Sequence, residues 1–171
     1  LLAFDETSVI VPELVGTQGF PASSLYFVDG NLSNSYDWPA GLVEGAYGTL
    51  PGNPATTDFQ DRLATVDPDL EDYSYAPESY DAVILAALAA AQGGSPDADT
   101  IKENLQSVSE GGTKCTDVAE CLQLIADGED IDYDGVSGPI EFDENGDPTQ
   151  AYIGVYQYGA ENTYTLVTTE E

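Results

Sequence analysis

Residues 25–30 read Leu25-Tyr26-Phe27-Val28-Asp29-Gly30, an apolar run that ends in an acidic turn. The run predicts a short buried strand at residues 25–28, since apolar and aromatic residues bounded by an Asp-Gly pair are typical of strands. Before it, residues 7–16 place apolar side chains at helical spacing and end at a glycine, which predicts a helix. After it comes an extended, glycine-containing run at residues 43–50. Alternating helix and strand signals indicate an α/β fold.

The alternation continues to the end of the chain, with one further strand expected at residues 1–4. We expect helices at residues 57–66, at 80–92 with Ser79 as N-cap, at 96–108 with Pro96 in the first position, and at 116–125 capped by Thr116. Residues 140–142 and 152–158 alternate apolar and polar side chains on either side of a turn at residues 144–147. This pattern predicts an antiparallel hairpin near the C-terminus.

The composition is globular but extremely acidic. The 171 residues are 42% hydrophobic, and 32 Asp and Glu face only three cations, Arg62, Lys102 and Lys114, for a net charge of −29. Nucleic acid and anionic membrane surfaces are excluded as partners, because both require clustered Lys and Arg. Two interpretations of this charge remain open. The protein comes from a saline habitat, where concentrated cations screen the carboxylates, or it is an acidic secreted protein from an ordinary habitat.

The residue inventory argues against an enzyme. There is no His, so a Ser-His-Asp or Cys-His arrangement cannot be built from this chain. Paired carboxylates of a carbohydrate-active enzyme remain an alternative, but with 32 acidic residues some pair arises by chance. We expect no cofactor.

Cys115 and Cys121 are close in sequence, and in a secreted chain such a pair predicts a disulfide that closes a small loop. Two free buried thiols are the alternative. A zinc site is not expected from two Cys without His.

No apolar run approaches the length of a membrane span, and no signal peptide is visible. The apolar opening at residues 1–4 resembles a cut through a folded region.

A calcium-binding pattern occurs at residues 130–141. Asp130, Asp132, Asp134, Gly135 and Glu141 match every required position of a calcium loop. A helix should follow such a loop, whereas residues 138–142 predict a strand. We therefore expect no metal here and interpret the segment as an acidic loop that enters a strand, with a calcium-dependent extracellular structural module as the alternative.

Asp29 is the better candidate for a binding residue. It follows an apolar strand directly, and ligands of open α/β sheets bind at the carboxyl ends of strands. A carboxylate at this position suits the ammonium group of a ligand, although an ordinary Asp-Gly turn is the alternative. Tyr73, Tyr75 and Tyr80 surround the loop that leads into the strongest predicted helix and could form a pocket wall.

Several segments together resemble one family. They are residues 1–5 (LLAFD), Val28-Asp29-Gly30 with Asn31, residues 44–51 (EGAYGTLP), residues 79–83 (SYDAV) and residues 138–147 (GPIEFDENGD). In order and spacing they resemble the C-terminal half of the leucine/isoleucine/valine-binding proteins. These are type I periplasmic binding proteins, the substrate-binding components of ABC importers. The likeness covers nearly the whole chain.

The resemblance implies part of a two-lobed α/β fold with mostly parallel sheets flanked by helices and a C-terminal hairpin. Residues 1–50 would belong to the second lobe, residues 51–153 would complete the first, and residues 154–171 would return to the second. The N-terminal half of the protein would lie outside this chain. Pro51 and the pair Ile153-Gly154 would lie near crossovers between the lobes.

The resemblance also implies a function and a site. The protein would capture an amino acid, with a branched-chain one as the first candidate, by hinge closure, and pass it to a membrane permease. Asp29 would face the ammonium group of the ligand, where many members carry Glu. Phe4, Asp5 and Tyr75 match positions that line the cleft. An extracellular or periplasmic lipoprotein, anchored through its N-terminus, is the expected form.

Overall fold

The computed structural model describes residue 1 and residues 3–170, and it confirms the α/β class. The chain forms two compact units, which are described separately. Unit 1 consists of Leu1–Gly52 and Tyr152–Glu171, and unit 2 consists of Asn53–Ala151. Unit 1 is therefore assembled from two segments that are distant in sequence, whereas unit 2 is one continuous stretch.

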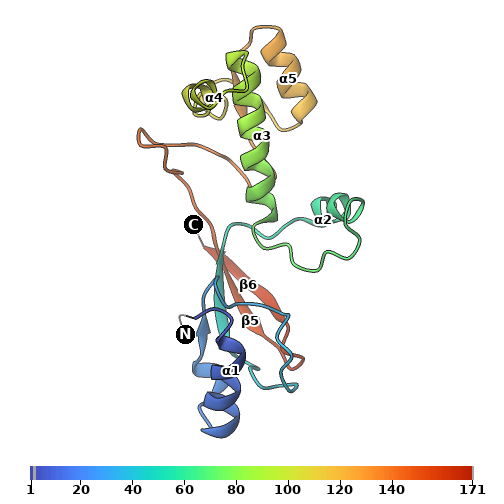
Figure 1. Ribbon diagram of the computed structural model, residues 1–171, viewed down its shortest axis with the longest axis vertical. Helices are drawn as coiled ribbons and strands as arrows, with labels where there is room; N and C mark the ends of the chain where they lie inside the picture. Colours follow the sequence, from blue (N-terminus) through green and yellow to red (C-terminus); the bar gives the residue numbers. More distant parts are fainter. Residues whose placement is uncertain (2, 171) are drawn as a thin grey trace. The chain divides into compact units, whose positions relative to one another are not determined.

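Unit 1 is built on a four-stranded sheet in the order β1-β2-β5-β6. Its strands are β1 (Tyr26–Phe27), β2 (Tyr47–Pro51), β5 (Ile153–Tyr158) and β6 (Tyr164–Glu170). β1 runs parallel to β2, and the β2–β5 and β5–β6 pairs are antiparallel. A C-terminal hairpin is thus present, but it is formed by β5 and β6, which lie side by side in Figure 1, and not by residues 140–142 with 152–158.

The helical part of unit 1 precedes the sheet. α1 (Thr7–Val11) continues into η1 (Pro12–Thr17), a stretch of wider π-helical turns, and a short 3-10 turn, η2 (Ala22–Ser24), leads into β1. The predicted helix at residues 7–16 is confirmed in extent. Pro12 lacks the amide donor of a regular α-helical turn, which accounts for the change of winding at that residue.

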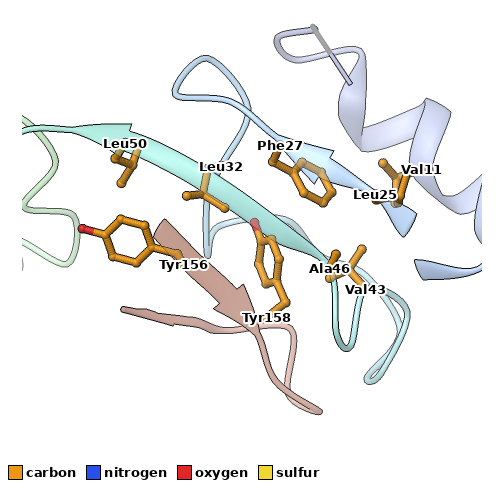
Figure 2. Packing of buried hydrophobic residues seen from close by; sticks show 9 residues of the cluster. All are labelled: Val11, Leu25, Phe27, Leu32, Val43, Ala46, Leu50, Tyr156 and Tyr158. Carbon is orange, nitrogen blue, oxygen red and sulfur yellow. The ribbon is translucent and has the colours of Figure 1, made fainter. Parts of the chain in front are cut away.

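The core of unit 1 packs between its helical segment and its sheet. Figure 2 shows the buried cluster: Val11, Leu25, Phe27, Leu32, Val43, Ala46, Leu50, Tyr156 and Tyr158. The Phe27 and Tyr158 rings meet edge to face with their centroids 5.4 Å apart, an arrangement that aromatic pairs favour. β1 is only two residues long, so this packing, rather than its ladder of hydrogen bonds, holds it against the sheet.

Unit 2 is mainly helical. Its helices are α2 (Thr57–Ala64), α3 (Ala76–Gly93), α4 (Ala98–Asn104) and α5 (Val118–Ala126), and its strands β3 (Thr113–Cys115) and β4 (Ile131–Tyr133) form a parallel pair. α4 and α5 both pack against α3 (Figure 1). The core between them contains Leu85, Leu88, Ala89, Val108, Cys115, Cys121, Ile131 and Tyr133.

Two predicted strands are absent from the described residues. Ala3 and Phe4 are not in a strand, although the Leu1 backbone nitrogen donates to the Tyr26 carbonyl at 2.6 Å beside β1; Leu2 lies outside the described residues. The turn at residues 144–147 forms: the Asp143 N–H donates to the Asp147 carbonyl at 2.8 Å, and Phe142 and Pro148 make an isolated antiparallel bridge. Residues 153–158, however, pair with β2 and β6 rather than with residues 140–142, so the predicted partners of this hairpin were wrong.

Helix starts also differ from expectation. α3 begins at Ala76 rather than at Tyr80, because Pro77 suits the first helical turn, and Gly94 ends it in the left-handed conformation. α4 is capped by Asp97, whose carboxylate accepts the Thr100 N–H at 2.9 Å. α5 is capped by Asp117 rather than by Thr116.

Candidate functional site

An open depression of about 310 Å³ lies in unit 1 beside the carboxyl end of β1. Ala3, Phe4, Glu6, Val28, Asp29 and Gly30 line it. Two chain segments therefore form its walls, a bend and turn before α1 and the turn that follows β1. The structure brings Phe4 and Asp29, both predicted site residues, to the same depression.

Gly30 allows these two walls to approach closely. A Cβ atom at residue 30 would lie 2.7 Å from Cε1 and 3.0 Å from Cδ1 of the Phe4 ring. The ring thus rests on the glycine backbone, while 68% of Phe4 remains exposed. An aromatic ring held against one wall and open to solvent offers an apolar or cation-attracting face to a ligand.

Asn31 connects the two chain segments that form the walls. Its Oδ1 accepts the Val28 N–H at 2.8 Å, and its Nδ2 donates to the Leu1 carbonyl and to Thr7 Oγ1, both at 3.2 Å. Asn31 is 2% exposed and Thr7 is fully buried. A buried carboxamide with partners on both segments ties the turn after β1 to the start of α1.

The charge around the depression has one sign. Glu6 and Asp29 line it, and the three Lys and Arg residues of the chain, Arg62, Lys102 and Lys114, all belong to unit 2. Unit 1 therefore offers carboxylates and no cationic side chain. Such a site attracts a positively charged group, such as an ammonium, and disfavours an anionic one.

Asp5 lies between the lining residues Phe4 and Glu6 but does not itself line the depression. It is exposed, and its backbone carbonyl accepts the Ser8 hydroxyl at 2.6 Å. Burial raises the pKa of the nearby Tyr36 hydroxyl, a hydrogen bond with Thr7 lowers it in part, and the charges of Asp5 and Glu6 raise it further. Asp5 thus contributes to the negative potential of this face.

Tyr75 belongs to unit 2 and is not among the residues that line the depression of unit 1. It precedes α3 with a φ of 60°, the left-handed conformation that favours glycine, and it is 41% exposed. A non-glycine residue in this conformation is strained, and such strain occurs often at functional positions. Its role at the ligand site stays a prediction.

The calcium pattern has another physical explanation. Lys114 Nζ lies 3.0 Å from Asp132 Oδ1 and 2.9 Å from Asp134 Oδ1, so an ammonium group sits where the pattern would place a cation. Gly135 lies directly against the Asp81 carboxylate, which leaves no room for a Cβ atom. Within residue 1 and residues 3–170, no three Cys, Asp or Glu side chains group as a metal site. This geometry argues against a calcium loop.

The predicted disulfide between Cys115 and Cys121 is present and buried. It joins β3 to α5 in the core of unit 2. Across the part of the chain that the structure describes, no helix has the length and apolar character needed to cross a membrane.

Sequence reasoning missed three contributors to the depression. Glu6 has no motif of its own and is recognisable only as a neighbour of Phe4 on the same turn. Gly30 was noted as part of a turn, whereas its role is the close contact with Phe4. Asn31 was noted within the family-like segment, but its bonds reach Leu1 and Thr7, contacts that a sequence pattern cannot reveal.

Comparison with known proteins identifies the class of this chain. Residues 15–160 match the family described as receptor family ligand binding region, and the chain belongs to that family. This confirms the expected resemblance to the type I periplasmic binding proteins. Over 151 residues the chain is 30% identical to the chemotactic signal transduction system substrate-binding protein BasB of Halobacterium salinarum, covering 86% of this chain and 35% of BasB.

A solved structure shows the same fold. The leucine binding protein LivK of Thermotoga maritima superimposes with a TM-score of 0.57 at 18% identity, covering 96% of this chain and 41% of LivK. The chain therefore spans well under half the length of both relatives. Both relatives are named as binding proteins, in agreement with the interpretation that this chain is not an enzyme.

Proposed function

We propose that this chain is part of an extracellular solute-binding receptor that captures an amino acid, with the ligand ammonium group held at Asp29. The observation that carries the proposal is the depression of unit 1, which combines the Asp29 and Glu6 carboxylates with the open Phe4 ring. A carboxylate beside an aromatic face is a suitable partner for an ammonium group. Membership in a ligand-binding family supports the same role.

The proposal extends to the architecture of the whole receptor. Residues 1–50 and 154–171 would be parts of one lobe, and residues 51–153 would complete the other, with Pro51 and Ile153-Gly154 near the crossovers. Separation of the chain into two compact units, at Gly52 and at Tyr152, supports this division. Binding would then proceed by hinge closure, to which Phe4, Asp5 and Tyr75 contribute.

Two downstream partners are compatible with such a receptor. The first is the membrane permease of an ABC importer, and a branched-chain amino acid is the first ligand to test, because the similar fold belongs to a leucine binding protein. The second is a membrane signalling protein, which the printed description of BasB as part of a chemotactic system favours. Loss of amino-acid uptake on deletion supports the permease, and loss of taxis with uptake intact supports the signalling partner.

The location follows from the same proposal. The family of binding proteins acts outside the cytoplasm, and a disulfide such as Cys115–Cys121 persists in oxidising compartments. We propose an extracellular or periplasmic receptor that is held at the membrane as a lipoprotein. Globomycin-sensitive processing or detergent-dependent extraction of the native protein would test that anchor.

The test is a thermal-shift screen of the full-length receptor in molar salt against leucine, isoleucine, valine and other amino acids. A ligand at 100 times its Kd stabilises the folded state by about 2.7 kcal/mol. We expect this shift for at least one amino acid, and we expect Asp29→Asn to weaken binding on the order of tenfold or more.

Asp37→Asn is the matched control, because Asp37 is an exposed acid of unit 1 that does not line the depression. It should bind as the wild type does. A shift that survives Asp29→Asn, or the absence of a shift with every amino acid, would remove the ligand and site assignment.

A further inference from the structure

Asn31 does not line the depression, but it bonds to Val28 in one wall and to Leu1 and Thr7, which flank the other wall in sequence. We propose that Asn31 is a positioning residue of the ligand site. Its carboxamide holds the segment that carries Phe4 and Glu6 against the turn that carries Asp29, and this spacing sets the affinity for the ligand. The proposal rests on the proposed function of the depression.

Both walls need such a tie because neither is a regular element. Residues 3–6 form a bend and a turn before α1, and residues 28–31 form a turn after β1. Segments of this kind are not held by a ladder of hydrogen bonds, and among the described residues a single bond, from the Leu1 nitrogen to the Tyr26 carbonyl at 2.6 Å, joins their backbones, so their relative position depends chiefly on side-chain contacts. A binding group must be kept within about 0.5 Å of its productive position by a supporting side chain.

The Asn31 carboxamide is suited to this task. It uses both amide protons, toward Leu1 and Thr7, and its oxygen accepts from Val28. Asn31 is only 2% exposed, so water has little access to its carboxamide. An apolar replacement therefore removes the partner of the Val28 N–H, the Leu1 carbonyl and the buried Thr7 hydroxyl at once, and the two segments must shift or admit water to satisfy them.

Asn162 provides an unusually close control within the same unit. It is also buried, at 8% exposure, and has the same bonding pattern: Oδ1 accepts the Val43 N–H at 3.2 Å, and Nδ2 donates to the Trp38 and Pro39 carbonyls at 3.3 and 2.8 Å. None of these partners lines the depression. Asn162 also has a φ of 55°, so its replacement by Ala strains the backbone and is the more damaging to the fold.

The experiment compares Asn31→Ala with Asn162→Ala in the full-length receptor. Leucine, isoleucine and valine are titrated calorimetrically in molar salt, at a temperature where circular dichroism shows both variants folded. We expect Asn31→Ala to weaken binding on the order of tenfold, and Asn162→Ala to change it by less than about twofold despite an equal or larger loss of Tm. Wild-type affinity in Asn31→Ala, or an equal loss of affinity in both variants, would overturn the positioning role.

The outcomes separate this proposal from the one on which it rests. Binding that depends on Asp29 but not on Asn31 removes only the positioning role. Failure of the wild type to bind any amino acid of the thermal-shift screen removes both proposals.

Should Asn31→Ala not fold, Thr7→Val tests the same link from the other end, because it removes the oxygen that accepts from Asn31 while keeping the side-chain shape. We expect about threefold weaker binding in Thr7→Val and wild-type binding in Thr7→Ser, which retains the hydroxyl. Wild-type affinity in Thr7→Val would contradict the proposal.

Discussion

Asp81 is a buried carboxylate that organises the loop after β4. At 2% exposure, its Oδ1 accepts the Tyr133 hydroxyl at 2.9 Å and the Val136 N–H at 3.1 Å, and its Oδ2 accepts the N–H and hydroxyl of Ser137 at 2.7 and 2.5 Å. Burial, reinforced by the bond to Asp81, raises the pKa of Tyr133, so this hydroxyl stays a donor at any physiological pH. Four donors converge here on one anion, an arrangement that offsets its loss of hydration.

Replacing Asp81 with Asn should destabilise unit 2 by about 3 kcal/mol, because the new amide group faces donors and can accept at only one of its two ends. Urea unfolding followed by circular dichroism measures this loss. Asp61→Asn is the control, since Asp61 is exposed on α2 and its replacement should change the free energy of unfolding by less than about 0.5 kcal/mol. A similar effect of both substitutions would contradict the role of Asp81.

Glu78 should make stability fall as pH rises. Burial raises its pKa above the ordinary value of 4.5, a backbone hydrogen bond lowers it in part, and the charge of Asp81 raises it further. Among the described residues its Oε1 finds no hydrogen-bond partner. The folded state therefore holds the Glu78 proton more tightly than the unfolded state, and this contribution to stability is lost as pH rises above about 4.5 through the raised folded pKa.

Glu78→Gln removes this titration. The Tm of the variant minus the Tm of the wild type should therefore be larger at pH 7 than at pH 4. Thermal unfolding at the two pH values measures the change. Glu71→Gln, at an exposed position, should show no such increase. A constant difference in Tm between Glu78→Gln and wild type would show that Glu78 titrates normally.

At the residue scale the sequence predicts which charged side chain lines the depression more readily than it predicts which residues contact each other. The position of Asp29 after an apolar strand, together with the family resemblance, led to a residue that lines the depression. Nothing in the pattern revealed that Asn31 would bond to Leu1, thirty residues away, or that Gly30 would support the Phe4 ring. Such contacts depend on how segments meet in space, and they are invisible to local periodicity.

At the scale of elements, long periodic segments were predictable and short ones were not. α2 and most of α3 agree with expectation because several turns of apolar periodicity define them. β3 and β4 were missed, since three residues are too few to show alternation and their stability comes from pairing with each other. The strand-like pattern at residues 140–142 was misleading, because alternation cannot ensure that a partner strand is in place.

The disulfide between β3 and α5 should stabilise the smaller sheet. Closing a loop of this length contributes about 2 kcal/mol in the chain-entropy description. We expect the double substitution Cys115→Ser with Cys121→Ser, or reduction by dithiothreitol, to lower the free energy of unfolding by about that amount. Reduction should leave the double variant unchanged, which provides the control, and an unchanged wild type would show that the bond adds nothing to stability.

At the scale of the whole molecule, the net charge of −29 in 18.1 kDa dominates the response to salt. Only one Lys, Lys114, is in an ion pair among the described residues, so carboxylate repulsion is met chiefly by dissolved cations. The screening length falls from about 10 Å at 0.1 M salt to about 3 Å at 1 M.

We therefore expect Tm to rise by roughly 10 °C between 0.1 M and 2 M KCl, as a gain of a few kcal/mol would produce. Sorbitol at equal osmolarity separates charge screening from general solute exclusion and should give a smaller rise. A Tm that is flat in KCl would mean that the acidic surface does not limit stability and would favour the interpretation as an ordinary acidic secreted protein.

The interleaved path of unit 1 affects how the protein is made. β2 and β5 are adjacent in the sheet, and at their junction the Gly52 N–H donates to the Tyr152 carbonyl at 2.7 Å. These two residues are 100 positions apart in sequence, so β2 pairs with β5 only after about 100 further residues have been synthesised. At 5–20 residues per second that delay is roughly 5 to 20 s. Unit 2 can fold in the interval, whereas the apolar side chains of Val11, Phe27 and Val43 stay exposed until β5, which completes their core, has been translated. We therefore expect a holding chaperone to bind the nascent chain. A stop codon before β5 would leave unit 2 complete but would remove β5 and β6, half of the sheet of unit 1.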